Sequence, residues 1–116
     1  MPKSSVKNKN EVKIKEPKMY NVIMYNDDFT TMEFVIFILV NIFKKNENEA
    51  FNLMMLVHKS GKAIVGKYTY DIAKTKSEYA ISLARKEGFP FKVVVKEVWF
   101  MQYSDLVKNI LNLNIA

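Results

Sequence analysis

The sequence predicts an α+β fold: a two-layer α/β sandwich in which three helices cover a small three-stranded antiparallel sheet. Three observations support this prediction. Short segments are rich in alternating or β-branched apolar residues, longer segments carry apolar residues at helical spacing, and the two kinds follow in the order β-α-α-β-α-β. At 116 residues, 49% of them hydrophobic, the chain is long enough to bury one core of this kind.

A polar arm precedes the first strand. Residues 1–17 are rich in lysine and have no periodicity, so we expect them to be disordered. The net charge of the chain is +6, and much of the excess lies in this arm. The arm has no arginine and no aromatic residue to stack on bases, so we interpret it as a solvated tail. From residue 18 to residue 98 we expect one folded domain.

The first strand and the first helix meet at an acidic turn. Met19–Tyr25 alternates as a strand, and Asn26–Asp28 follows with side chains that favour turns. The next segment has a composition typical of strands, but its apolar stretch continues to Phe43, which is long for a strand. Thr30 and Glu33 have the spacing of a capping box, in which the threonine caps the helix and the glutamate reaches back to the cap. We therefore predict a helix capped by Thr30.

The remaining elements alternate between helix and strand. Glu49–Lys59 has helical spacing, and Gly61 is well placed to end that helix. Ala63–Tyr68 is predicted as a strand, Tyr70–Glu87 as a helix and Phe91–Val98 as the last strand. The predicted inner face of the third helix consists of Ile72, Ala73, Tyr79, Ala80, Leu83 and Ala84.

Residues 99–116 are additional to this domain, and Ser104 is a candidate cap for a short helix within them. The chain has no cysteine, which excludes disulfides and thiol chemistry. Its longest apolar run, Phe34–Val40, is far shorter than the roughly 20 residues of a membrane span. No secretory signal is visible. We expect a cytoplasmic protein without membrane contact.

Two places carry polar residues suited to binding: the turn after the first strand, and His58, the only histidine. A protonated α-amine has donors only, so its receptor must offer acceptors. Asn26, Asp27 and His58 can supply three of them. The apolar residues that can wall a pocket beside them are Met32, Val35, Met54 and Val57. Methionine suits a pocket that accepts several shapes, but on spacing alone these four residues fit ordinary core packing better.

An enzymatic interpretation of the same residues is weaker. A histidine with carboxylates can act in acid–base chemistry, but the sequence has no Ser-His-Asp context and no glycine-rich phosphate loop. Asp27, Asp28 and His58 are of metal-ligating types. Adjacent aspartates are more often turn residues, however, and a lone histidine at a helix end is more often only hydrogen-bonded. We predict no catalysis, no metal and no cofactor.

Two separate motifs resemble a known family. Residues 19–35, MYNVIMYNDDFTTMEFV, are similar to the signature of the ClpS adaptors of Clp proteases, Tyr-x-Val-x-x-x-Asn-Asp-Asp-x-Thr-Pro-Met-Glu-Phe-Val. The second hallmark, residues 54–58 (MMLVH) followed by residues 61–66 (GKAIVG), also matches. The resemblance covers residues 19–98. It implies an adaptor that binds the free N-terminus of proteins beginning with Leu, Phe, Tyr or Trp and delivers them to a Clp protease.

The resemblance also implies roles for individual residues. Asn26, Asp27 and His58 match the residues that hold the α-amine, and Met32 matches the one that excludes β-branched first residues. The substrate-binding set that it implies is Asn26, Asp27, Asp28, Thr30, Met32, Val35, Met54, Val57, His58 and Phe91. Asp71 and Lys76 match contacts with the N-terminal domain of the Clp ATPase, ClpA or ClpC. The arm of residues 1–17 matches the extension that the ATPase engages during hand-off.

One departure from the family pattern is Thr31, which replaces a proline. Proline at the first helical position pre-orders a helix start, so we expect a looser turn here. Two alternatives stay open at this point: a ribosomal-stalk-like or RNA-associated α/β domain, and a metal-dependent hydrolase that uses Asp27, Asp28 and His58. We expect a monomer that binds no nucleic acid.

Overall fold

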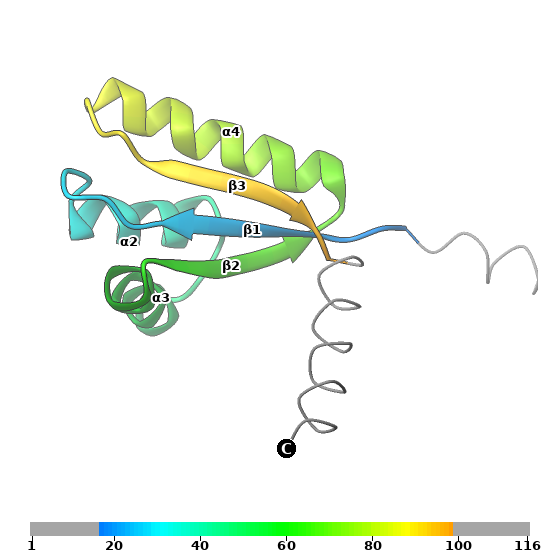
Figure 1. Cartoon of the computed structure of the whole chain (residues 1–116), viewed down its shortest axis with the longest axis horizontal. Coiled ribbons are helices and arrows are strands. Elements are labelled where there is room, and N and C mark those ends of the chain that lie inside the picture. The colour runs from blue at the N-terminus through cyan, green and yellow to red at the C-terminus, as the bar shows by residue number, and fades with distance from the viewer. Residues whose placement is uncertain (1–16, 99–116) are drawn as a thin grey trace, which may run out of the picture.

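The computed structural model describes residues 17–98, and its elements follow the predicted order. They are β1 (Tyr20–Tyr25), α2 (Met32–Asn41), α3 (Glu47–Ser60), β2 (Lys62–Tyr68), α4 (Tyr70–Lys86) and β3 (Lys92–Glu97). The strands form one antiparallel sheet in the order β2-β1-β3, which places the first strand in the centre. Figure 1 shows α4 running along β3, with α2 behind β1 and α3 beside β2. The predicted two-layer α+β fold is confirmed.

Parts of the sequence-based prediction fall outside the described residues. These are the arm, except for Pro17, and the extension of residues 99–116 with its candidate helix at Ser104. Within residues 17–98, none of the helices is long and apolar enough to cross a membrane.

The core lies between the sheet and the helices. Its largest fully buried side chains are Phe91, Met24, Ile38, Leu39, Val22 and Val65. Burying one such side chain stabilises the fold by about 1.5–3 kcal/mol relative to leaving it in water. Phe91, which directly precedes β3, packs edge-on against Phe34 of α2 with ring centroids 6.1 Å apart. This contact joins the loop that precedes β3 to the helix that follows β1.

The start of α2 differs from the capping-box prediction by one residue. The cap is Thr31, whose Oγ1 accepts a hydrogen bond from the Phe34 amide at 3.2 Å. The Thr30 hydroxyl instead donates to Oδ2 of Asp27 at 2.7 Å. A hydrogen bond to a charged carboxylate is stronger than one between neutral groups. Thr30 is therefore held in the turn, and the predicted box with Glu33 does not form.

Both ends of α3 are capped: a side chain caps its start, and a glycine ends it. The Asn46 side chain accepts from the Glu49 amide at 2.8 Å, so the helix begins two residues before the predicted Glu49. Gly61 ends the helix in the left-handed conformation, with φ of 88°, as predicted. The Gly61 carbonyl also accepts from the Asn26 amide at 2.8 Å. This bond ties the end of α3 to the end of β1.

The inner face of α4 is narrower and less hydrophobic than predicted. Ile72 and Tyr79 are 48% and 57% exposed, so their assignment to the inner face was wrong. The residues that α4 buries are Ala73, Ser77, Ala80 and Ala84. These small side chains let the helix lie close to the sheet. Ile72 and Tyr79, each one position away from a buried alanine, therefore point away from the sheet.

A β-bulge distorts β2. Ile64 and Gly66 pair with consecutive residues of β1, so Val65 is the extra residue, and it points into the core with 2% exposure. A Cβ atom on Gly66 would lie 2.5 Å from the ring of Tyr68. A side chain at position 66 would therefore force the Tyr68 ring, which folds back over its own strand, to move.

Candidate functional site

A cavity of about 440 Å³ lies between the start of α2, the second half of α3 and the turn after β1. All ten residues that the sequence analysis assigned to substrate binding line it: Asn26, Asp27, Asp28, Thr30, Met32, Val35, Met54, Val57, His58 and Phe91. They come from segments far apart in the chain. The order of the elements brings these segments together at one end of the sheet.

The turn after β1 is organised by one carboxylate. Oδ1 of Asp27 accepts from the amides of Phe29 at 2.8 Å and Thr30 at 2.7 Å, and Oδ2 accepts from the Thr30 hydroxyl at 2.7 Å. Burial acts to raise the pKa of the Asp27 carboxyl, but the hydrogen bonds from Thr30 and Phe29, with the charge of Arg85, hold the pKa below its ordinary value. Asp27 therefore presents a negative charge to the cavity at neutral pH.

Thr31, where the family pattern has proline, contributes a hydrogen bond of its own. Its hydroxyl oxygen caps α2 by accepting from the Phe34 amide. Such a cap is worth about 1 kcal/mol of helix stability. The helix start is therefore fixed by a side-chain hydrogen bond of Thr31, where the family pattern uses the rigid ring of proline.

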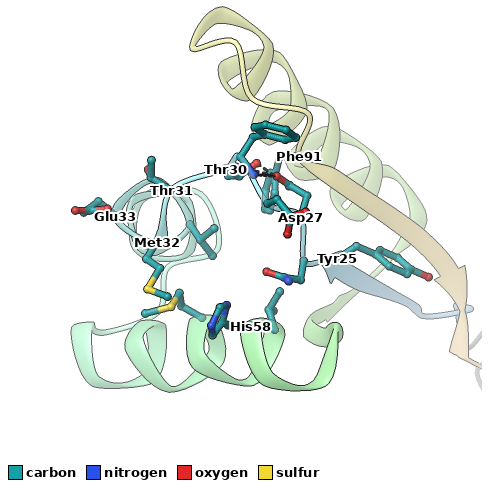
Figure 2. Close-up of a pocket in the computed structure, with 14 residues that line it drawn as sticks. Tyr25, Asp27, Thr30, Thr31, Met32, Glu33, His58 and Phe91 are labelled. Carbon is teal, nitrogen blue, oxygen red and sulfur yellow. Dashed lines mark hydrogen bonds between the residues drawn. The ribbon is translucent and has the colours of Figure 1, made fainter.

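Two further acceptors line the same cavity as Asp27. The bond between the Asn26 amide and the Gly61 carbonyl places Asn26 near the end of α3, where His58 lies less than one turn before Gly61. Figure 2 shows His58 pointing from α3 into the cavity, opposite Asp27. Within residues 17–98, the side chains of Asn26 and His58 make no hydrogen bond with another residue. Their oxygen and nitrogen atoms are available to a ligand.

The floor of the cavity is apolar, and a methionine borders its mouth. Val35, Met54 and Val57 line it while being only 7%, 4% and 3% exposed. Met32 is 43% exposed, and Figure 2 shows its side chain extending from α2 toward α3. A methionine at this position can adapt to several ligand shapes.

Four lining residues were not among those predicted: Tyr25, Phe29, Thr31 and Glu33. Figure 2 shows the side chains of Tyr25 and Glu33 directed away from the cavity. Phe29 is 73% exposed on its rim. The sequence could have indicated Phe29, because it is a large aromatic residue in a polar turn and no helix or strand periodicity explains its position.

A metal centre is not evident at this site. Within the described part of the chain, no group of three or more His, Cys, Asp or Glu side chains could hold a metal ion. The hydrolase alternative, with Asp27, Asp28 and His58 as ligands, therefore has no ligand set in residues 17–98.

The fold and the cavity together define a small α+β binding domain, in which charged or polar acceptors border an apolar hollow. Residues 15–94 match the family described as ClpS, the ATP-dependent Clp protease adaptor protein. The chain is 51% identical over 90 residues to the adapter ClpS of Clostridium acetobutylicum, covering 78% of this chain and 89% of that protein. It is 48% identical over 89 residues to the adapter ClpS of Nautilia profundicola, covering 77% of this chain and 92% of that protein.

A solved structure agrees with these sequence relatives. ClpS2 of Agrobacterium tumefaciens, bound to L-phenylalaninamide, is similar with a TM-score of 0.68 and 36% identity, covering 71% of this chain and 99% of that one. The chain therefore belongs to the ClpS family of ATP-dependent Clp protease adaptor proteins. The resemblance found in the sequence is confirmed, and so is the prediction of an adaptor rather than an enzyme.

The ionisation of Asp27 predicts how the stability of this turn depends on pH. Because its pKa is lower in the folded than in the unfolded chain, this carboxylate adds stability above the ordinary pKa of about 3.9, and that stability is lost as the pH falls through the folded value. Asp27→Asn keeps one acceptor oxygen but does not ionise. We expect the free energy of unfolding of the wild type to fall more than that of Asp27→Asn between about pH 7 and pH 3, measured by urea unfolding. An identical pH dependence in both proteins would contradict this assignment.

Proposed function

We propose that the cavity binds the free α-amine and the bulky hydrophobic first residue of proteins marked for degradation, which the chain then delivers to a Clp protease. One observation carries the proposal: the buried apolar floor lies directly beside three acceptors. Asn26, Asp27 and His58 would accept hydrogen bonds from the ammonium group and the first peptide unit. The first side chain would lie on Val35, Met54 and Val57, with Phe91 deeper in the floor.

The ligand of the similar structure supports this choice. L-phenylalaninamide, bound to ClpS2 of Agrobacterium tumefaciens, has a free α-amine, a benzyl side chain and an amide in place of the next peptide bond. It thus imitates the first residue of a protein that begins with phenylalanine. We extend the proposal to Leu, Tyr and Trp, since a methionine-lined mouth and an aliphatic floor accept large apolar groups of different shape.

The energetics are compatible with reversible capture. Burying a Leu or Phe side chain contributes about 1.5–3 kcal/mol, and each hydrogen bond to a charged group contributes about 1.5–3 kcal/mol. After the cost of association, this suggests a dissociation constant on the order of 1 μM. Both parts of the ligand are needed, so internal chain segments, which lack the amine, and small or charged first residues are rejected.

The amine requirement can be tested with one set of peptides. Acetylation removes the charge and a donor, so we expect a peptide that begins with Leu to bind at least about tenfold more weakly once acetylated. Replacing that Leu with Ala should weaken binding comparably, because the apolar floor is left in contact with water. Isothermal titration calorimetry measures both effects. If acetylation left the affinity unchanged, the acceptor cluster would have another role.

The role of Met32 can be tested by enlarging the mouth. We expect Met32→Ala to admit peptides beginning with Ile or Val, whose branched Cβ needs more width near the backbone. Peptides beginning with Leu should lose less than about tenfold in affinity, because Met32 is half-exposed and contributes little burial. The same calorimetric assay applies, with Phe37→Ala as a control, since Phe37 is 51% exposed on the same helix and does not line the cavity. Continued exclusion of Ile and Val by Met32→Ala would remove Met32 from this role.

We further propose that Asp71 and Lys76 of α4 contact the N-terminal domain of the Clp ATPase. Asp71 is exposed in the first turn of the helix. Lys76 is half-buried, and its Nζ donates to the carbonyl of Ile42 at 2.6 Å and lies 5.5 Å from the Tyr68 ring centroid. Asp71 is thus the more accessible of the two, whereas Lys76 also stabilises the end of α2.

Charge reversal separates the partner contact from helix stability. We expect Asp71→Lys to weaken binding to a purified ClpA or ClpC N-terminal domain by at least about tenfold, measured by surface plasmon resonance. Glu47→Lys is the matched control, since Glu47 is an exposed acid in the first turn of α3. Equal affinities for the two variants would place the interface elsewhere. Comparing ClpA with ClpC would also identify the ATPase type.

The cytoplasmic location and the monomeric state stay predictions from the sequence. Cell fractionation with an antibody against the chain tests the first, and sedimentation of the purified protein tests the second. Recovery in the membrane fraction, or a dimer at micromolar concentration, would contradict them.

A further inference from the structure

A second groove, of about 480 Å³, lies between α3 and the edge strand β2. Its apolar lining consists of Leu53 and Leu56 of α3 with Ile64 and Val65 of β2. Leu56 and Ile64 are each 48% exposed, whereas Val65 is buried. The residues that line this groove differ from those that line the cavity, so the proposed capture of N-termini does not use it.

The chain leaves the described part of the structure close to one end of this groove. The Val98 amide donates to the Met19 carbonyl at 2.8 Å, which holds the end of β3 beside the start of β1. Lys67 of β2, which lines the groove, lies two strands away from Lys96 of β3 in the same row of the sheet. Two strand spacings are about 10 Å, and an extended segment of five residues spans about 17 Å. Residues 99–103 are therefore long enough to reach the groove.

The sequence of residues 104–116 has the pattern of an amphipathic helix. Leu106, Ile110 and Leu113 are spaced i, i+4 and i+7, so they would share one helix face, and the segment contains no glycine or proline. From Leu106 to Leu113 a helix rises about 10 Å, which matches the length of β2 from Ile64 to Lys67. A helix this short is only marginally stable alone in water, so it needs an apolar surface to lie on.

We infer that residues 104–116 form a helix that docks in the groove between α3 and β2. Leu106, Ile110 and Leu113 lie against Leu56 and Ile64 in this arrangement. The docked helix fastens α3, which carries part of the cavity lining, to the edge of the sheet.

The size of the groove favours a segment of the same chain over a separate partner. A stable interface between two proteins buries about 800 Å² on each partner. Even a fully buried aromatic side chain contributes only about 150–250 Å², and Leu56 and Ile64 are smaller and already half-buried. A tethered segment is present at an effective concentration in the millimolar range, so a small contact is sufficient to hold it.

The charges around the groove also fit this occupant. Lys45 and Lys67 line it together with Glu49, so both signs are present. The extension likewise carries both signs, as Asp105 and Lys108. A separate partner that is selected by its charge needs a surface of one sign, which this groove does not offer.

Introduced cysteine pairs test the contact in the full-length protein, because the chain has no cysteine of its own. We expect Leu56→Cys with Ile110→Cys to form an intramolecular disulfide at least about tenfold faster than Leu56→Cys with Asn112→Cys, whose second thiol lies on the polar face of the helix. A second control is Tyr79→Cys with Ile110→Cys, since Tyr79 is 57% exposed on α4. Mild oxidation followed by mass spectrometry of the intact protein measures the rates.

Labelling of a single cysteine gives an independent measurement from the β2 side of the groove. With Ile64→Cys, we expect thiol modification to become at least about fivefold faster when Leu106→Asp and Ile110→Asp are added, because a buried unpaired charge is unfavourable and the helix leaves the groove. The matched control, Lys108→Asn with Asn112→Asp, makes the same change of net charge on the polar face. It should stay within about twofold of the unmodified extension.

Three outcomes would overturn the inference. The first is an equal disulfide rate in the three cysteine pairs, and the second is a labelling rate that the substitutions in the extension do not change. The third is the formation of disulfide-linked dimers faster than the intramolecular bond, which would make a second copy the occupant. Leu56→Cys and Ile64→Cys alter half-exposed side chains on two different elements, so one measurement stands if the other variant does not fold.

Discussion

Three hydrogen bonds to the Asp27 carboxylate decide how the chain leaves the central strand and enters its first helix. They hold Thr30 in the turn, so that Thr31 caps α2. As a result, Met32 and Val35 of that helix line the cavity. The same carboxylate keeps its charge because these donors favour the ionised form. One side chain thus shapes the turn that borders the cavity and adds a negative charge to it, and a change at this position affects both.

The central strand has one face in the core and leads into the candidate site. Val22 and Met24 point into the core, whereas Ile23 and Tyr25 lie on the opposite face of the sheet, and the strand ends in the turn that borders the cavity. Small residues on α4 allow close packing on the inner face. The site therefore rests on a rigid support, because its turn follows a strand that is hydrogen-bonded on both sides.

The order of the elements was predictable because periodicity lies within short stretches of sequence. Nine of the ten predicted lining residues lie in the two motifs that resemble the family, and Phe91 was added from the wider resemblance. The cap was mispredicted because both threonines suit a cap, and the choice depends on a hydrogen bond to Asp27 that the pattern does not contain. Ile72 and Tyr79 were misplaced because the small residues of α4 decide which face meets the sheet. Phe29 was missed because it lies in a turn, where no helical or strand periodicity indicates which way a side chain points. Which side chains of the three strands lie beside one another depends on strand register, which local sequence does not determine.

The bulge at Val65 has a consequence for how this small sheet behaves in a crowded cell. Both β2 and β3 are edge strands, whose unpaired backbone groups can recruit a strand from another molecule. The bulge makes one edge irregular, and lysines near the ends of both edge strands repel a second copy that approaches with the same charges. These features therefore disfavour edge-to-edge pairing between two copies of this sheet.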